Sequence, residues 1–325
     1  MSSVQIVAGG AGFIGVNLLR RLVPEGACLV VLDNLSRGRR EYLDGLGGTG
    51  VIVFHDCDLS RREEVRSAFA AAAALGRVSE VWHLAANSDI PAGVADPDID
   101  LRDTFLTTFE ILRAMREHGV GTLHFASSSA IYGDLGSTVL QEEVGPLLPI
   151  SNYGAMKLAS EAQATAAAEA GLERLNIFRF PNVVGVPATH GVILDFARKL
   201  RGDPSRLDVL GDGTQQKAYL HVSDLVDAML AVRARPQATH GRVEVVNIGP
   251  VDEGVRVSWI AQQVVARISP GARIVFGEGN KGWVGDVPRF SYSTQRLQSF
   301  GWRPSLDSAA AVRRAIDEIA LQQGF

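Results

Sequence analysis

The segment that decides the fold is VQIVAGGAGFIG, residues 4–15. It opens with a continuous apolar run and passes directly into a turn with Gly9, Gly12 and Gly15. Short, nearly continuous apolar runs are typical of strands that are buried on both faces of a parallel sheet. A glycine-rich turn between such a strand and a helix lets the backbone approach a pyrophosphate, whose charge then lies at the helix N-terminus. The segment therefore predicts a strand, a phosphate-binding turn and a helix.

Strand-like runs and helical stretches alternate along the first 180 residues. The predicted strands are Val4–Ala8, Leu29–Leu32, Val51–Phe54, Val81–Leu84, Leu123–Ala126 and Leu175–Phe180. The predicted helices between them are Gly12–Leu22, Arg61–Leu75, Pro97–His118 and Tyr153–Ala170. Such alternation implies right-handed βαβ units and an α/β fold with a doubly wound parallel sheet.

After Phe180 the alternation breaks down, because prolines and glycine-rich turns separate shorter elements. Helices are predicted at Val192–Arg201, Val222–Arg233 and Leu306–Gln322. We expect residues 1–180 to form a nucleotide-binding domain, to which about 220–250 return. Residues 181–325 are expected to form mainly a smaller C-terminal α/β lobe that binds substrate.

Composition narrows the function further. The chain has 325 residues, 46% of them apolar, and a formal net charge of −4. This balance fits a globular protein and opposes a nucleic-acid-binding role. No apolar run approaches the roughly 18–20 residues that span a bilayer. Cys28 and Cys57 lie in strand contexts and are expected to be reduced core residues. Together with the absence of a long apolar run, this leads us to expect a soluble cytoplasmic protein without membrane partners. The seven histidines are scattered, and no metal site is predicted.

Acidic and small residues follow the next predicted strands. Asp33 ends the second strand, 18 residues after Gly15, and can accept hydrogen bonds from the ribose hydroxyls of an adenosine. A carboxylate there favours NAD over NADP, although Arg37, Arg39 and Arg40 could offset its repulsion of a 2′-phosphate. Asp58 and Leu59 could contact the adenine, with a helix N-cap as an equal alternative for Asp58.

A candidate catalytic group lies in the second half of the same domain. In a helix, Tyr153 and Lys157 share one face, and Ser127, Ser128 and Ser129 follow the fifth strand. A nearby ammonium lowers the pKa of a phenol, and a serine hydroxyl beside it can hold or pass a substrate proton. A Tyr and a Lys also occur together on ordinary amphipathic helices.

The combination resembles the extended short-chain dehydrogenase/reductases, within them the nucleotide-sugar epimerase/dehydratase group of the UDP-glucose 4-epimerase type. The resemblance covers essentially the whole chain and implies a Rossmann-type sheet. The segments that carry it are Gly9–Gly15, Asp33–Gly38, His83–Ala86, Ser127–Gly133, Tyr153–Lys157, Arg179–Gly185, Gly211–Val222 and Gly285–Arg289.

The resemblance implies roles for individual residues. Ser128, Tyr153 and Lys157 would be catalytic, with Tyr153 as the base and Lys157 on the nicotinamide ribose. The residues implied for NAD binding are Gly9, Gly12, Phe13, Ile14, Gly15, Asp33, Asn34, Ser36, Asp58, Leu59, Leu84, Ala85, Ala86, Tyr153 and Lys157. Those implied for the substrate are Ser128, Ser129, Tyr153, Asn182, Lys217, Arg289 and Phe290.

The substrate residues also have simpler interpretations. Asn182 could be a turn residue, and Lys217 and Arg289 could be solvated surface charges. Relatives usually have Arg at position 217, and Lys cannot form the same bidentate contact with a phosphate. Phe290 would be a bulky residue near the sugar C2, which disfavours an N-acetyl group. A UDP-sugar of the glucose or galactose type is the expected substrate.

The residues after the catalytic serine limit the reaction. The family's 4,6-dehydratases have Asp-Glu where this chain has Ser129 and Ala130, and its decarboxylases have Glu at position 130. Its uronate epimerases tend to have an arginine where residues 186–188 are Val-Pro-Ala. The remaining expectation is 4-epimerisation through a transient 4-keto sugar. The alternatives are a 4-ketoreductase, a dehydratase, or a uronate or heptose 4-epimerase.

The family often pairs two helices with those of a second subunit in a four-helix bundle. The corresponding helices here are Pro97–His118 and the helix of Tyr153. In the first, Leu101, Phe105 and Phe109 recur at near-helical spacing with Leu112 and Met115. We therefore expect a homodimer, with an ordinary core helix in a monomer as the alternative.

Overall fold

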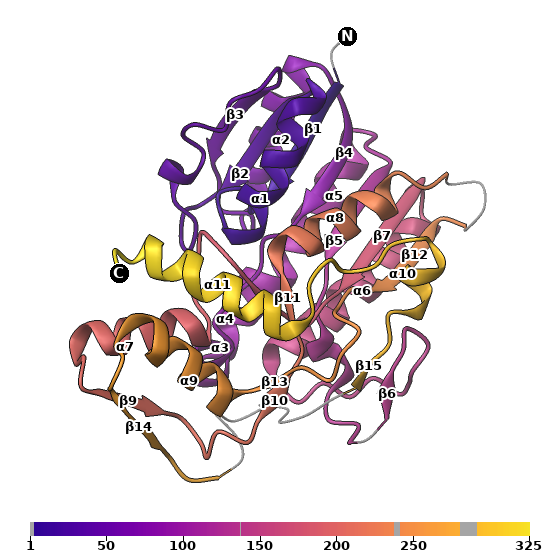
Figure 1. Ribbon diagram of the computed structural model, residues 1–325. Helices are drawn as coiled ribbons and strands as arrows, with labels where there is room; N and C mark the ends of the chain where they lie inside the picture. The colour runs from indigo at the N-terminus through magenta and orange to yellow at the C-terminus, as the bar shows by residue number, and fades with distance from the viewer. Residues whose placement is uncertain (1–2, 137, 237–240, 280–290) are drawn as a thin grey trace. The chain divides into compact units, whose positions relative to one another are not determined.

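A seven-stranded sheet is the largest element of the computed structural model, which describes residues 3–136, 138–236, 241–279 and 291–325 (Figure 1). Its strand order is β12-β7-β5-β4-β1-β2-β3. The strands are β1 Ser3–Ala8, β2 Cys28–Asp33, β3 Val51–Asp56, β4 Arg77–His83, β5 Thr122–Ala126, β7 Arg174–Arg179 and β12 Val243–Asn247. The pairs from β3 to β7 are all parallel. The expected doubly wound parallel sheet is therefore confirmed.

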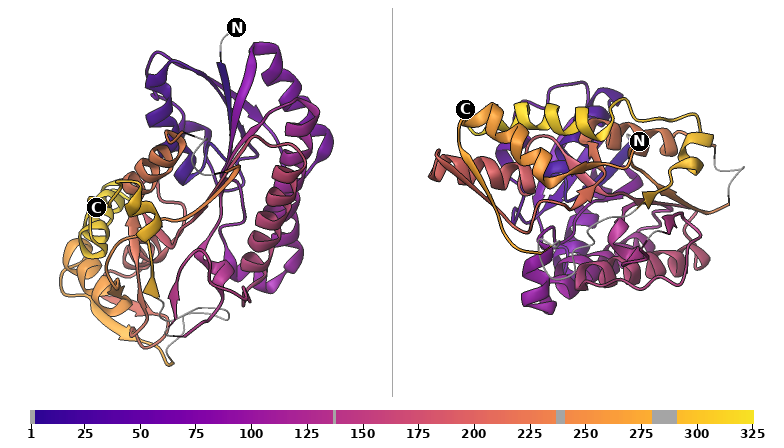
Figure 2. Two further views of the ribbon diagram at one scale, coloured as in Figure 1. Left: turned by 90° about the vertical axis from the view of Figure 1, so that its right-hand side faces the viewer. Right: turned by 60° about the horizontal axis from the view of Figure 1, so that its bottom comes forward.

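Helices cover both faces of this sheet (Figure 2). The helices that follow its strands along the chain up to residue 169 are α1 Phe13–Leu22, α2 Arg62–Leu75, α3 Ile90–Ala95, α4 Pro97–Asp100, α5 Thr107–Glu117 and α6 Asn152–Glu169, with the 3₁₀ turns η1 Val23–Glu25 and η2 Arg40–Tyr42. One core lies between the sheet and α2, α5 and α6, where Phe69, Met115 and Ala164 are fully buried beside Ile6 and Phe125. Alternate strand residues face the other side, because successive side chains of a strand point in opposite directions.

The helix expected at Pro97–His118 differs from its prediction. The π-helical turn η3, Leu101–Leu106, separates α4 from α5. A π-helical turn contains an extra residue, which rotates the side chains on either side of it relative to each other. As a result Leu101 is 44% exposed, whereas Leu112 and Met115 are buried. The apolar face that the spacing suggested is therefore not one continuous core face.

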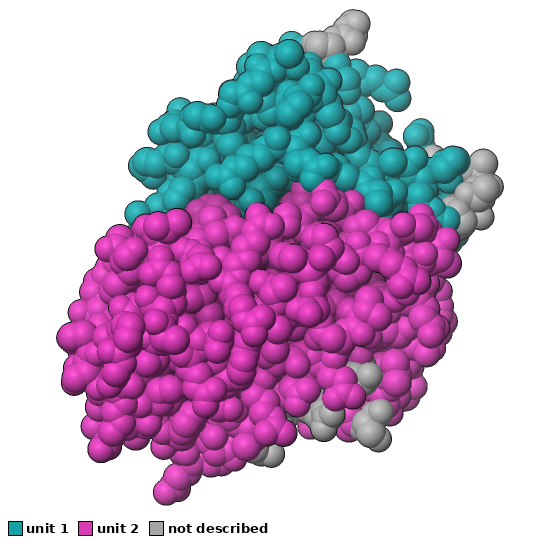
Figure 3. Space-filling model, in the orientation of Figure 1, with its two compact units in different colours: residues 1–131, 151–179, 229–246 teal, residues 132–150, 180–228, 247–325 magenta. Residues whose placement is uncertain are grey.

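The described chain divides into two compact units (Figure 3). Unit 1 contains residues 1–131, 151–179 and 229–246, and unit 2 contains residues 132–150, 180–228 and 247–325. The segment 132–150, which sequence analysis counted with the first domain, thus belongs to unit 2. Every residue proposed for catalysis or NAD binding lies in unit 1.

Unit 2 is built from three long helices and small sheets. Its helices are α7 Val192–Gly202, α9 Val257–Ile268, α10 Gln295–Ser299 and α11 Ser308–Gln322, and α8 Val222–Arg233 begins in it. Its strands are β6 Val139–Leu140, β8 Asn182–Val184, β9 Arg206–Val209, β10 Gln216–Lys217, β11 Tyr219–His221, β13 Val255–Arg256, β14 Arg273–Phe276 and β15 Ser291–Tyr292. The 3₁₀ turn η4, Ser129–Tyr132, leads into it from unit 1. Apolar residues of α7, α9 and α11 form its core with β9 and β14.

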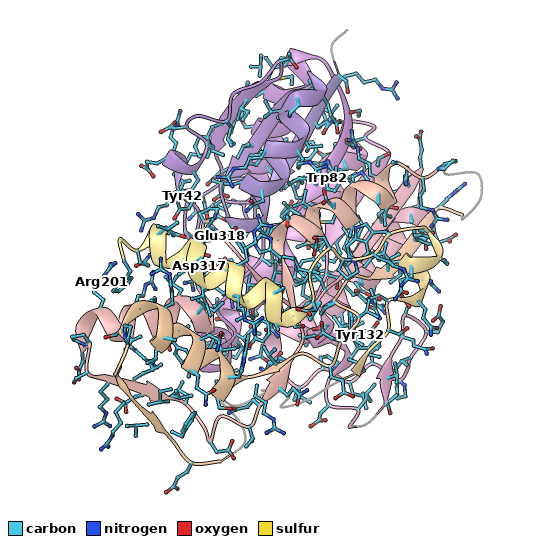
Figure 4. All side chains as sticks on the ribbon, viewed as in Figure 1. Tyr42, Trp82, Tyr132, Arg201, Asp317 and Glu318 are labelled. Atoms are coloured by element: carbon cyan, nitrogen blue, oxygen red, sulfur yellow. The ribbon has the colours of Figure 1, made fainter. Side chains whose placement is uncertain are left out.

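Buried and partly buried hydrogen bonds hold the less regular parts of unit 2. The Tyr132 hydroxyl donates to Asn247 Oδ1 at 2.8 Å. His221 Nε2 lies 3.1 Å from Glu318 Oε2 on α11, and both Tyr132 and Glu318 are labelled in Figure 4. Asp224 accepts from the backbone N–H groups of Ser305 and Leu306. None of the helices in the described ranges is long and apolar enough to cross a membrane.

Candidate active site

The glycine-rich turn brings the ends of β1 and β4 together. Gly9 has φ +79°, a region that side chains disfavour, and a Cβ there would lie 2.7 Å from Ala85 N. A Cβ on Gly15 would lie 2.5 Å from Gly10 Cα, so α1 packs directly on the turn. Gly12 is the N-cap of α1 and supplies no side-chain acceptor. The first-turn N–H groups of α1 therefore lack a side-chain cap and can bind an anion.

Asp33 lies at the end of β2, beside this turn. Its Oδ2 accepts from Ala11 N at 3.0 Å, and its Oδ1 accepts from Leu35 N at 2.9 Å. Burial raises the pKa of the Asp33 carboxyl, and the two N–H donors oppose that rise. Each carboxylate oxygen has a further lone pair, so the group can still accept from two ribose hydroxyls.

Two of the three arginines after Asp33, Arg37 and Arg40, are engaged with neighbouring groups. Arg37 forms an ion pair with Asp89 at 2.9 Å, and the Arg40 guanidinium lies 4.8 Å from the centre of the Phe54 ring. Asn34 Oδ1 accepts from Ser36 N at 3.1 Å and so shapes the loop. The ion pair partly neutralises the charge of Arg37, which weakens its ability to offset the repulsion between Asp33 and a 2′-phosphate.

The segment after β3 is held by local bonds. Asp58 Oδ1 accepts from both the backbone N and the Oγ of Ser60, at 3.0 and 2.7 Å. The N-cap of α2 is Arg61, so neither Asp58 nor Ser60 caps that helix. Leu59 is buried in the core of unit 1. After β4, the N–H groups of Leu84 and Ala85 both donate to Ala8 O.

Ser128, Tyr153 and Lys157 come together at the carboxyl end of β5. Tyr153 is in the first turn of α6, where the Ser151 side chain caps the helix by accepting from Gly154 N at 3.1 Å. The Ser128 side chain is close enough to the Tyr153 hydroxyl to lower its pKa. Lys157 Nζ donates to Ala126 O and lies 5.9 Å from the centre of the Tyr153 ring. The helical spacing thus places both side chains where the sequence predicts.

Burial dominates the electrostatics of this group. It raises the pKa of Tyr153 to about 12, with Ser128 lowering and Asp100 raising that pKa. It lowers the pKa of Lys157 to about 7, against the field of Glu161. Lys157 therefore needs nearby negative charge to stay protonated, and a charged Lys157 stabilises a Tyr153 phenolate. The arrangement can move a proton to or from a hydroxyl group.

Two groups of residues beside this site were missed by sequence analysis. The first is the buried set Ser127, Glu161 and Arg179, in which Ser127 Oγ donates to Glu161 Oε1. The spacing of four residues between Lys157 and Glu161 is the signal that could have revealed it. The second is Asp100, which immediately precedes the π-helical turn and accepts from Asn87 Nδ2 at 2.9 Å. No pattern in the sequence indicated that turn.

His83, buried at the end of β4, gives a pH-dependent prediction. Burial lowers its pKa from 6.5 to about 3, with Lys157 adding to the effect. Between pH 6.5 and about 3, His83 therefore binds a proton in the unfolded chain but not in the folded chain. The stabilisation that comes from neutral His83 is complete above pH 6.5 and declines toward pH 3. Between these pH values we expect the free energy of unfolding, measured with urea, to fall about 1.4 kcal/mol per pH unit more steeply for the wild type than for His83→Gln. Parallel curves for the two proteins would contradict this assignment.

The proposed substrate residues are only partly described. Asn182 Nδ2 donates to Ala218 O at 3.5 Å, and β8 pairs with β11, where Asn182 is opposite Tyr219. Lys217 is paired with Val255 across β10 and β13. Asn182 and Lys217 thus both border Ala218 in unit 2. Arg289 and Phe290 lie outside the described residues.

The fold and the nucleotide end define a dinucleotide-dependent α/β enzyme. The model of the NAD dependent epimerase/dehydratase family matches residues 5–249, and the chain belongs to this family. It is 33% identical to the UDP-glucose 4-epimerase of Streptomyces lividans over 258 residues, 74% of each chain. A crystal structure of a UDP-galactose 4-epimerase is similar with a TM-score of 0.84 and 35% identity, covering 98% of this chain and 99% of that one.

A further similar structure bears on the cofactor. The UDP-glucose 4-epimerase of Thermus thermophilus in complex with NAD has a TM-score of 0.82 and 29% identity, covering 97% of this chain and 98% of that one. The residues present fit such a group, since uncapped N–H groups are available at α1 and Asp33 retains acceptor capacity. The predictions of an NAD-dependent enzyme and of this family are confirmed.

Proposed function

We propose that the protein is a nucleotide-sugar 4-epimerase acting on UDP-glucose and UDP-galactose, with Tyr153 as the base. The observation that carries the proposal is the placement of Tyr153 beside Ser128, with Lys157 one helical turn away and its Nζ 5.9 Å from the centre of the Tyr153 ring. Ser129 and Ala130 provide no carboxyl group that could remove water or a carbon-bound proton. The relatives named above, all 4-epimerases of UDP-glucose or UDP-galactose, support the same reaction.

Each of the three residues has a distinct task in this proposal. Tyr153 removes the proton of the sugar 4-hydroxyl, Ser128 holds that oxygen in place, and the Lys157 ammonium stabilises the phenolate. Bound NAD supplies a site that accepts the C4 hydride and returns it. After the 4-keto sugar has rotated in the site to present its other face, Tyr153 returns the proton to the oxygen at C4. No proton is exchanged at a carbon atom.

The substrate contacts are proposed mainly for the diphosphate. Asn182 and Lys217 would contact it, together with Arg289, because amide and ammonium donors suit phosphate oxygens. Phe290 would limit the space at the sugar C2. Ser129 would lie beside the sugar. A grip on the diphosphate that leaves the sugar loose suits a reaction in which the sugar must turn.

The homodimer and the cytoplasmic location are also part of the proposal. Phe105 and Phe109 are partly exposed, with tilted rings whose centres lie 6.3 Å apart, and they support a subunit interface. Cys28 and Cys57 are both free thiols, which supports a reducing compartment.

The reaction is tested by proton NMR of the protein with UDP-glucose in D₂O, without added cofactor. We expect UDP-galactose to appear with no deuterium on its carbon atoms, because the hydride returns to the carbon it left. Deuterium at C5 or C6 would show that a carbon-bound proton is removed and would rule out simple epimerisation. If UDP-glucose is unchanged while UDP-glucuronate or a nucleotide-linked heptose reacts, the substrate assignment is wrong.

A further inference from the structure

We propose that Glu161 is a positioning residue for the reaction at Tyr153. Its carboxylate connects the strand end that carries Ser128 to the helix that carries Tyr153 and Lys157. The inference rests on the proposed function, since it concerns the geometry of the same three residues. Glu161 itself would touch neither sugar nor cofactor.

The contacts of Glu161 join three elements of unit 1. From the end of β5, Ser127 Oγ donates to Glu161 Oε1. From the end of β7, Arg179 Nε donates to Oε1 at 3.0 Å and Arg179 Nη2 donates to Oε2 at 2.6 Å. Ser127, Glu161 and Arg179 are 1%, 5% and 6% exposed. A buried carboxylate with three charge-assisted or hydroxyl donors has a well-defined position.

Helix α6 is bonded to the end of β5 at a second point. Tyr153, Lys157 and Glu161 are four residues apart and lie along one face of α6. Lys157 Nζ donates to Ala126 O, the residue before Ser127. Ser127 N also donates to Phe178 O at 2.8 Å. Two consecutive residues are thus fixed to α6 and β7 immediately before Ser128.

This geometry explains why Ser128 faces Tyr153. With Ala126 and Ser127 fixed, the chain has little freedom at the next residue, and the Ser128 Oγ is held further by accepting from Ala130 N at 3.1 Å. A displacement of about 1 Å at a reacting group can cost on the order of 100-fold in rate. Loss of the Glu161 bond should therefore reduce the rate of the chemical step more than substrate binding.

The charge of Glu161 gives it a second influence on the site, through Lys157. Within unit 1, the titratable groups beside Tyr153 and Lys157 are Glu161 on α6, Asp100 on α4, His83 on β4 and, through Glu161, Arg179 on β7. Glu161 is the one that favours the ammonium form of Lys157. Glu161→Gln keeps the shape of the side chain while removing its charge.

A purely structural ion pair is the competing explanation. Removing one member of a buried pair destabilises a protein because it leaves the other charge unpaired. Glu80→Gln is the matched control, because Glu80 is a buried carboxylate of unit 1 that binds His124 and Arg233 and lies in the middle of β4. It should lower the unfolding temperature without a specific effect on the reaction.

The test compares the NAD-bound full chain with its Glu161→Gln, Ser127→Ala, double and Glu80→Gln variants in the UDP-glucose reaction. We expect kcat to fall about 10- to 30-fold in Glu161→Gln and about 3- to 10-fold in Ser127→Ala, with KM within about 2-fold. Both changes break the same contact, the bond between Ser127 and Glu161. The kcat of the double variant should therefore match that of Glu161→Gln within about 2-fold rather than show the product of both effects. Glu80→Gln should retain kcat within about 2-fold.

A second readout needs no turnover. With ¹³Cζ-labelled tyrosine, the Tyr153 resonance is assigned by its loss in Tyr153→Phe, and its titration midpoint is followed in each NAD-bound variant. We expect Glu161→Gln to raise the midpoint by about 0.5 units or more and Ser127→Ala to raise it less, because the phenolate loses donors and positive charge. If the wild type epimerises no UDP-sugar, the proposed function fails, and this titration still decides the role of Glu161.

The proposal is overturned by a defined set of results. These are wild-type kcat and an unchanged Tyr153 titration in a folded Glu161→Gln or Ser127→Ala protein, or additive effects in the double variant. If Glu161→Gln does not fold, Ser127→Ala decides alone, since it removes only a hydroxyl group and leaves the pair of Glu161 and Arg179 intact.

Discussion

Tyr153→Phe is expected to lower kcat for the interconversion of UDP-glucose and UDP-galactose by about 10³-fold, within the range of a lost general base. The phenol is the group placed to exchange a proton, because Ser128 lies beside it and the Lys157 ammonium lies one helical turn away. The change removes a single oxygen and keeps the ring. NAD content and unfolding temperature should therefore remain near those of the wild type.

Tyr42→Phe is the matched control for this experiment. Tyr42 belongs to the 3₁₀ turn η2 of unit 1 and is labelled in Figure 4. Its hydroxyl has no place in the proposed chemistry, so kcat should stay within about 2-fold of the wild type. If Tyr153→Phe retains more than about a tenth of the wild-type kcat, another group is the base, because a general base contributes at least about 100-fold.

The central sheet could be predicted because its strands have an unambiguous signal. Runs such as Leu29–Leu32 are apolar throughout, as expected of strands with helices on both faces, and the glycine turn after β1 fixes where the first helix begins. The helix that carries Tyr153 and Lys157 could also be predicted. Their spacing of four has a geometric meaning only in a helix, and the structure places them on α6.

The π-helical turn and the buried charges could not be predicted in the same way. A π-helical turn depends on how the helix packs, and the side chains of Leu101–Leu106 do not by themselves favour it. The bond between Ser127 and Glu161 joins residues 34 apart, and such a pair is set by the packing of α6 on β5. Ser127, Ser128 and Ser129 look equivalent in the sequence. Their surroundings separate them, since Ser127 donates a hydrogen bond to Glu161 and Ser128 lies beside Tyr153.

In unit 2, the intrinsic propensity of the residues and the spacing of the apolar residues indicate different structures. α9, Val257–Ile268, is rich in valine and isoleucine, which favour strands, and it was not among the expected helices. Its buried residues, Ile260, Ala261, Val264 and Val265, nevertheless follow the spacing of a helix. In this segment the positions of the apolar residues were the better guide, and their intrinsic propensity was the weaker one.

Gly15→Ala is expected to abolish measurable NAD binding and to destabilise unit 1 by about 3 kcal/mol, an effect typical of severe overpacking. The new Cβ would lie 2.5 Å from Gly10 Cα, and a backbone atom in a tight turn cannot move away as a flexible side chain can. Either α1 shifts or the turn opens, and both displace the uncapped N–H groups from the site of the pyrophosphate. Urea unfolding and an NAD titration followed by tryptophan fluorescence measure the two effects. Gly47→Ala is the control, because a Cβ there meets nothing within 4 Å, and both quantities should be unchanged. Wild-type NAD affinity in Gly15→Ala would mean that the turn does not hold the dinucleotide.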